Sequence, residues 1–107
     1  MPPTKPAYSI ADKQIIAESP EVRATLMTFD PGQEIPWHTH SNITDTSFCL
    51  KGAVEVSLRA PDEIVRLEPG QWKAVPVGRP HRVRCLGPGQ CQVLLVQGVG
   101  SYDFMPA

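Results

Sequence analysis

Four side chains that could bind a metal ion lie at intervals suited to a shared site. His38 and His40 are separated by one residue, Asp45 follows four residues after His40, and His81 is the third histidine of the chain. Successive side chains of a strand point to opposite faces, so His38 and His40 project the same way if their segment is extended. Two imidazoles so placed can bind one ion at about 2.0–2.1 Å from each nitrogen. One prediction is therefore a metal site that combines these histidines with His81 and has Asp45 beside it. The alternative is that each histidine is a structural or surface residue.

Short β-strands are the elements predicted to position these residues. Turns rich in proline and glycine, such as Asp30-Pro31-Gly32, separate apolar or alternating runs, and no segment has a capped helical period. The expected strands are 14–17, 22–29, 34–40, 46–51, 53–59, 63–67, 71–75, 81–85 and 91–97. Short strands at this spacing predict an all-β sandwich or barrel. The length fits a single domain over residues 1–107, with 1–8 as a loose N-terminal arm.

Charge and cysteine content indicate which partners, which cellular location and which cysteine chemistry to expect. The chain has 10 basic and 11 acidic residues and a net charge of −1, so we expect neither a nucleic-acid nor a membrane partner. The N-terminal segment has no long apolar run, and the predicted location is the cytoplasm. Cys49, Cys85 and Cys91 are interpreted as small buried apolar residues. The alternative for Cys85 and Cys91 is a disulfide across the turn between them.

Glycines and a proline stand at fixed intervals around the histidines. The first stretch, residues 32–52, reads G-QEIPW-HTH-SNIT-D-TSFCLK-G, and the second, from residue 70, reads G-QWKAV-PVG-RP-H. These intervals resemble the two motifs of the cupin family, which here cover residues 32–52 and 70–85. The resemblance implies a small antiparallel double-stranded β-helix, also called a jelly-roll barrel, and commonly a homodimer. It assigns metal-ligand roles to His38, His40 and His81, for one divalent transition metal ion (iron, manganese, nickel or zinc).

Asp45 stands where the family has glutamate. Aspartate is one methylene shorter, which shortens its reach by roughly 1.5 Å. It is a metal ligand if the preceding turn moves inward. Otherwise Asp45 orients a histidine or a bound water, or acts as the general base that deprotonates the substrate.

Residues on the same strand faces are predicted to line the pocket. Alternation places Ser47 and Cys49 on the face of Asp45, and Val83 and Cys85 on the face of His81. Packing alone is the alternative role for Ser47 and Cys49. No basic residue is evident as an anchor inside this pocket, although Arg79 could reach its rim.

Three functions are compatible with such a site. The first is a small-molecule dioxygenase or oxygenase with a redox-active ion. The second is a non-redox isomerase or lyase acting on a sugar acid or another small carboxylate. The third is a non-catalytic module that binds a small molecule. The resembled family includes all three, so the fold does not choose between them.

Overall fold

The structure is a computed structural model that describes residues 8–98 and 103–107, so most of the predicted arm at 1–8 lies outside the described residues. Ten strands and no helix occur in this part of the chain. They are β1 (Asp12–Glu18), β2 (Val22–Phe29), β3 (Glu34–Thr39), β4 (Thr44–Lys51), β5 (Val54–Leu58), β6 (Glu63–Leu67), β7 (Trp72–Val75), β8 (His81–Cys85), β9 (Cys91–Gly98) and β10 (Met105–Pro106). The nine predicted strands are confirmed within two residues at each end. The short β10 was not predicted.

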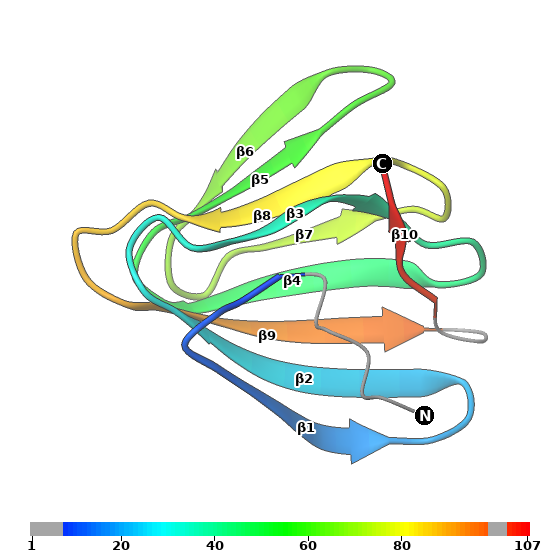
Figure 1. The fold of residues 1–107 in the computed structure, drawn as a ribbon, viewed down its shortest axis with the longest axis horizontal. Helices are drawn as coiled ribbons and strands as arrows, with labels where there is room; N and C mark the ends of the chain where they lie inside the picture. Colours follow the sequence, from blue (N-terminus) through cyan, green and yellow to red (C-terminus); the bar gives the residue numbers. More distant parts are fainter. Residues whose placement is uncertain (1–7, 99–102) are drawn as a thin grey trace.

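The strands form two five-stranded sheets that face each other (Figure 1). One has the order β1-β2-β9-β4-β7 and the other β10-β3-β8-β5-β6, with antiparallel pairing throughout. Apart from the hairpins β1–β2 and β5–β6, strands that follow each other in sequence, such as β3 and β4, lie in different sheets. This is the predicted jelly-roll barrel.

Apolar side chains from the inner faces of both sheets fill the space between them. Along β2 and β9 every second residue is buried, as expected for strands with one face on a core. Met27, Phe29, Val56, Val83 and Val93 are at most 2 % exposed. Burial of this apolar surface is the main force that holds the two sheets together.

A β-bulge in β3 determines where the histidines point. Ile35 pairs with Val83, whereas His38 pairs with His81, so three steps on β3 match two steps on β8. Without the extra residue, Ile35 and His38 would face opposite sides of the sheet. With it, both side chains are buried at 2 % exposure. Pro36 lies within the bulge, where a residue without an N–H is tolerated.

Cysteines meet at the end of the barrel where β8 ends and β9 begins. A disulfide joins Cys85 to Cys91, with α-carbons 5.7 Å apart, so the interpretation of both as free thiols was wrong and the alternative holds. The turn between β8 and β9 is short enough for the two residues to face each other. Cys49 is free and buried. Gly52 has φ +77°, and a Cβ there would lie 2.9 Å from Cys91 Sγ, which explains the glycine that closes the first motif.

Candidate metal centre

The structure brings His38, His40, Asp45 and His81 together between the two sheets. His38 lies on β3, His40 follows its last residue, Asp45 is the second residue of β4, and His81 begins β8. Each is 2 % exposed. One potential ligand atom from each residue lies within 4.8 Å of all the others.

The Asp45 carboxylate is at the centre of this cluster. Its Oδ2 lies 2.9 Å from His40 Nε2, 2.8 Å from His81 Nε2 and 3.7 Å from His38 Nε2. Neighbouring ligands of an ion with bonds of about 2.1 Å are roughly 3.0 Å apart in octahedral and 3.4 Å apart in tetrahedral geometry. The distances from Oδ2 to the three Nε2 atoms are therefore compatible with four donors that share one ion.

The far nitrogens of the three rings each meet a backbone carbonyl. His38 Nδ1 lies 2.7 Å from Pro36 O, and His81 Nδ1 lies 2.9 Å from Arg79 O. His40 Nδ1 makes a short hydrogen bond to Asp103 O. A carbonyl oxygen only accepts hydrogen bonds, so Nδ1 carries the proton on each ring. The lone pair of each neutral ring is then on Nε2, which points to the centre, and the carbonyls fix the ring orientation as in known metal sites.

The arrangement leaves a place for positive charge. Three Nε2 lone pairs and a carboxylate oxygen are all acceptors, and acceptors at 2.8–2.9 Å repel each other unless a cation or a proton lies between them. The second carboxylate oxygen, Asp45 Oδ1, is buried and has no hydrogen-bond partner among the described residues. These two observations favour a bound cation over a purely structural polar cluster.

Electrostatics in the metal-free protein follow from the same contacts. Burial would raise the pKa of Asp45, but hydrogen bonds from His38, His40 and His81 outweigh it and hold this pKa well below its ordinary value. Burial would lower the pKa of His40, but the hydrogen bond and charge of Asp45 raise it overall. For His38, burial dominates and lowers the pKa. Protons can thus take the place of the metal, so metal binding weakens as the pH falls.

The C-terminal segment 103–107 contacts the cluster, which the sequence did not indicate. Asp103 O accepts the hydrogen bond from His40, and Asp103 Oδ1 accepts one from Ser41 N at 2.8 Å. The Phe104 ring stacks on His38. β10 pairs with β3 beyond these residues (Figure 1). The segment is too short to have a strand pattern, so no sequence signal could have identified it.

The four residues predicted to line the pocket are buried on the inner faces. Ser47 and Cys49 follow Asp45 on β4, and Val83 and Cys85 follow His81 on β8. Cys85 lies at the end of β8 opposite His81 and is bonded to Cys91. Whether these side chains meet a ligand stays a prediction, as does the single domain over residues 1–107.

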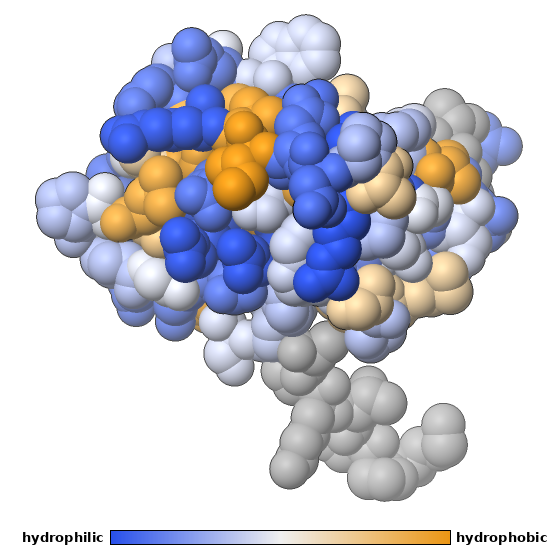
Figure 2. Space-filling view, turned by 90° about the horizontal axis from the view of Figure 1, so that it is seen from above, coloured by the Kyte–Doolittle hydropathy of each residue, from blue (hydrophilic) through white to orange (hydrophobic). Residues whose placement is uncertain are grey.

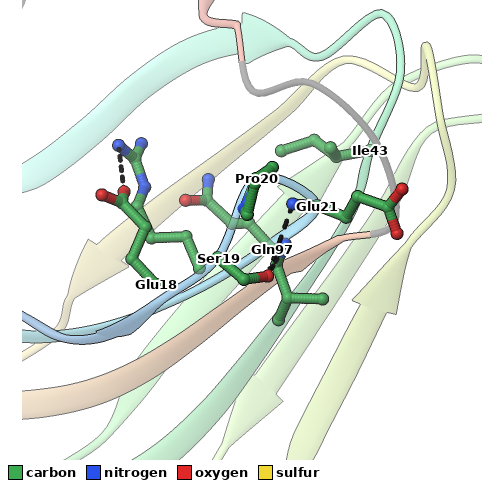
Figure 3. Close-up of a pocket in the computed structure, with 8 residues that line it drawn as sticks. Glu18, Ser19, Pro20, Glu21, Ile43 and Gln97 are labelled. Atoms are coloured by element: carbon green, nitrogen blue, oxygen red, sulfur yellow. Dashed lines mark hydrogen bonds and ion pairs between the residues drawn. The ribbon is translucent and has the colours of Figure 1, made fainter.

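A cavity of about 420 Å³ lies at the end of the barrel that holds the cluster. The turn between β1 and β2 forms one wall, and Ile43 and Gln97 form the other (Figure 3). Gln97 pairs with Asp45 across β9 and β4. Arg23 also lines this cavity, whereas none of the four clustered residues does. The expectation that the pocket at the cluster lacks a basic anchor stays a prediction. The sequence did not identify which face of β2 is inward, because both faces carry polar and apolar residues.

Comparison with known proteins agrees with the jelly-roll fold. The model of the cupin domain family (Cupin_2) matches residues 25–97. No curated protein matches the chain in sequence.

Solved structures with the same fold come from several bacteria. An uncharacterised double-stranded β-helix protein from Klebsiella pneumoniae superposes with a TM-score of 0.81 at 22 % identity, covering 97 % of this chain and 84 % of the other. KdgF from Halomonas sp. gives 0.74 at 25 % identity, covering 86 % of each chain. A cupin-2 domain protein from Shewanella frigidimarina gives 0.69 at 18 % identity, covering 84 % and 82 %. With its match to the family model over residues 25–97, this chain belongs to the cupin domain family.

Proposed function

We propose that the chain is a small-molecule oxygenase whose single divalent metal ion is held by His38, His40, His81 and Asp45. The observation that carries the proposal is the convergence of three Nε2 atoms and one carboxylate oxygen in a buried space. When bound, the ion supplies Lewis acidity and, if it is iron, manganese or nickel, redox chemistry with dioxygen. If the ion were six-coordinate, these four residues would leave room for a substrate that binds it through two atoms.

Each residue of the chain has a defined part in this proposal. The histidines hold the ion, and their Nδ1–H donors keep the rings in place through backbone carbonyls. Asp45 is proposed as a ligand because Oδ2 lies within 2.9 Å of two Nε2 atoms. As a ligand it lowers the net charge of the site, which favours the higher oxidation state of a redox metal. The role of general base applies only if Asp45 leaves the ion.

A non-redox isomerase or lyase of a sugar acid or small carboxylate is the second candidate. The same four ligands suit zinc, which polarises a carbonyl without redox chemistry. Arg23 at the cavity mouth favours this candidate, because a guanidinium is suited to bind a carboxylate. A non-catalytic module that binds a small molecule is the third candidate, and an experiment must distinguish it from the two enzymes.

Metal analysis of protein purified without added metal tests the proposal. Iron, manganese or nickel at one equivalent, with dioxygen uptake on chelating diols, diketones or hydroxy acids, supports an oxygenase. Zinc without dioxygen uptake supports the second candidate if a substrate is converted and the third if one is only bound. His38→Ala/His81→Ala protein is expected to lose the metal, whereas the exposed variant Asp62→Asn keeps it. Full metal occupancy in the double histidine variant would reject the site.

A homodimer is proposed on the basis of family membership and surface character. Seen from the side of β5 and β6, the surface carries an apolar patch among charged side chains (Figure 2). On β6 and β7, Ile64 is 72 % exposed and Trp72 is 59 % exposed. Light scattering at micromolar concentration tests this, since a monomer has a mass of 11.7 kDa.

The cellular location stays a prediction. No helix in the described part of the chain is long and apolar enough to cross a membrane. The cytoplasm is the proposed compartment, although a disulfide between Cys85 and Cys91 is more usual in oxidising ones. Fractionation of cells that express the tagged protein distinguishes the cytoplasm from an oxidising compartment.

A further inference from the structure

Arg23, Gln97 and Asp45 form one row across three neighbouring strands of the barrel wall. Arg23 of β2 pairs with Gln97 of β9, and Gln97 pairs with Asp45 of β4. Residues paired directly across antiparallel strands point to the same face of the sheet. Asp45 and Gln97 are buried inside the barrel at 2 % and 4 % exposure, so Arg23 also belongs to the inner face. The next inner residue of β2, Thr25, is 1 % exposed.

This row runs from Asp45, in the candidate metal centre, to Gln97 and Arg23, which line the cavity. Neighbouring strands are about 4.8 Å apart, which puts the α-carbons of Arg23 and Asp45 roughly 10 Å apart. An arginine side chain can extend over more than half of that distance. Arg23 and Gln97 both line the cavity of about 420 Å³, a volume typical of small-molecule sites. A ligand of roughly this length, with one end at the cluster, would therefore span to Arg23.

Glu18 forms an ion pair with Arg23 beside the cavity. Its side chain is 18 % exposed, and Nη1 lies 3.7 Å from Glu18 Oε2, whose side chain is 53 % exposed. A charge-assisted hydrogen bond is about 2.7–2.9 Å long, so this exposed pair is weak. The carboxylates of Glu18 and Glu21 point to opposite sides of the cavity (Figure 3). A small acid can displace Glu18 and bind the fork of the guanidinium with two hydrogen bonds.

We propose that the substrate is a small organic acid with two ends: a pair of oxygens that chelates the metal, and a carboxylate that binds Arg23. The Gln97 amide, which can donate and accept, lies between the two ends and is suited to bind a hydroxyl or carbonyl oxygen. Ile43, 1 % exposed, gives the cavity an apolar wall. This inference rests on the proposed metal centre, because one end of the acid binds there.

Binding of two matched acids to zinc-loaded protein tests the inference without turnover. The probe 2-oxoglutarate has a chelating 2-oxo acid and a distal carboxylate, whereas 2-oxopentanoate has the same chain without that carboxylate. Calorimetry on the wild type is expected to give at least roughly tenfold tighter binding of 2-oxoglutarate. Arg23→Gln is expected to remove this preference and leave the affinities for zinc and 2-oxopentanoate unchanged. Arg66→Gln makes the same charge change at a side chain that is 65 % exposed, and is expected to keep the preference.

The outcomes separate this inference from the proposed function. If the wild type binds zinc but binds both acids equally, or if Arg23→Gln retains the preference, the role of Arg23 is rejected while the metal centre stands. If the wild type binds no zinc, the metal centre and this inference both fail. Arg23→Lys keeps the charge but loses the fork, and is expected to keep only part of the preference. If Arg23→Gln does not fold, Arg23→Lys and the comparison of the two acids on the wild type still test the role of Arg23.

Discussion

Phe104 stacks on the imidazole of His38, with ring centroids 4.5 Å apart and 20° between the ring planes. The two residues are far apart in sequence, since His38 is on β3 and Phe104 directly precedes β10. The Tyr8 ring also packs against Phe104, with ring centroids 5.8 Å apart. An aromatic ring in this position limits the rotation of His38 and covers one side of the candidate metal centre.

Phe104→Ala is therefore expected to weaken zinc binding roughly tenfold, as loss of a group that orients a ligand usually does. It should also lower the free energy of unfolding by about 1–3 kcal/mol, because the ring is only partly buried. Calorimetry and urea unfolding measure the two effects. Phe48→Ala is the matched control, since Phe48 contacts Trp72 instead of the histidines. Unchanged zinc affinity in Phe104→Ala would mean that the ring only packs.

Asp45→Asn tests the carboxylate with almost no change of shape. An asparagine amide can donate a hydrogen bond to an Nε2 lone pair, so the metal-free cluster is satisfied while the ligand charge is lost. We expect zinc affinity to fall at least roughly 10–100-fold. Asp45→Glu, which keeps the charge, should lose less. The exposed substitution Asp62→Asn removes the same charge and should leave the affinity as it is. Wild-type affinity in Asp45→Asn would exclude Asp45 as a ligand.

Strand periodicity and motif spacing were sufficient to predict the barrel and the four clustered residues. β2, β6 and β8 have the predicted bounds, because each is an apolar or alternating run between clear turn residues. The bulge at Pro36 was not predictable, since alternation alone puts Ile35 on the opposite face from His38. The contacts of Asp103 and Phe104 depend on the path of the chain after β9. They arise from tertiary packing, for which a strand of two residues gives no sequence signal.

Acid should destabilise the metal-free protein through Asp45. The folded-state pKa of Asp45 lies below its unfolded value of about 3.9. Its contribution to stability is therefore fully present above about pH 4 and is lost as the pH falls further. His40, with a raised pKa, and His38, with a lowered pKa, contribute with opposite signs near pH 6.5. Urea unfolding in a chelator should give a difference between wild type and Asp45→Asn that shrinks below pH 4. A difference that is constant down to pH 3 would contradict the depressed pKa.

From the Cys85–Cys91 disulfide we predict the number of free thiols and a change in stability, and neither depends on a bound metal. Alkylation after unfolding should modify one cysteine, Cys49, without reductant and three with it. Loss of the bridge in Cys85→Ala/Cys91→Ala should lower the free energy of unfolding by about 2 kcal/mol, because the bridge closes only a short loop. Zinc affinity should stay within about twofold, since His81 lies at the other end of β8 and its ring is held by Arg79 O. Three reactive thiols before reduction would show that the bridge is absent. A large loss of zinc affinity would show that the two ends of the barrel are coupled.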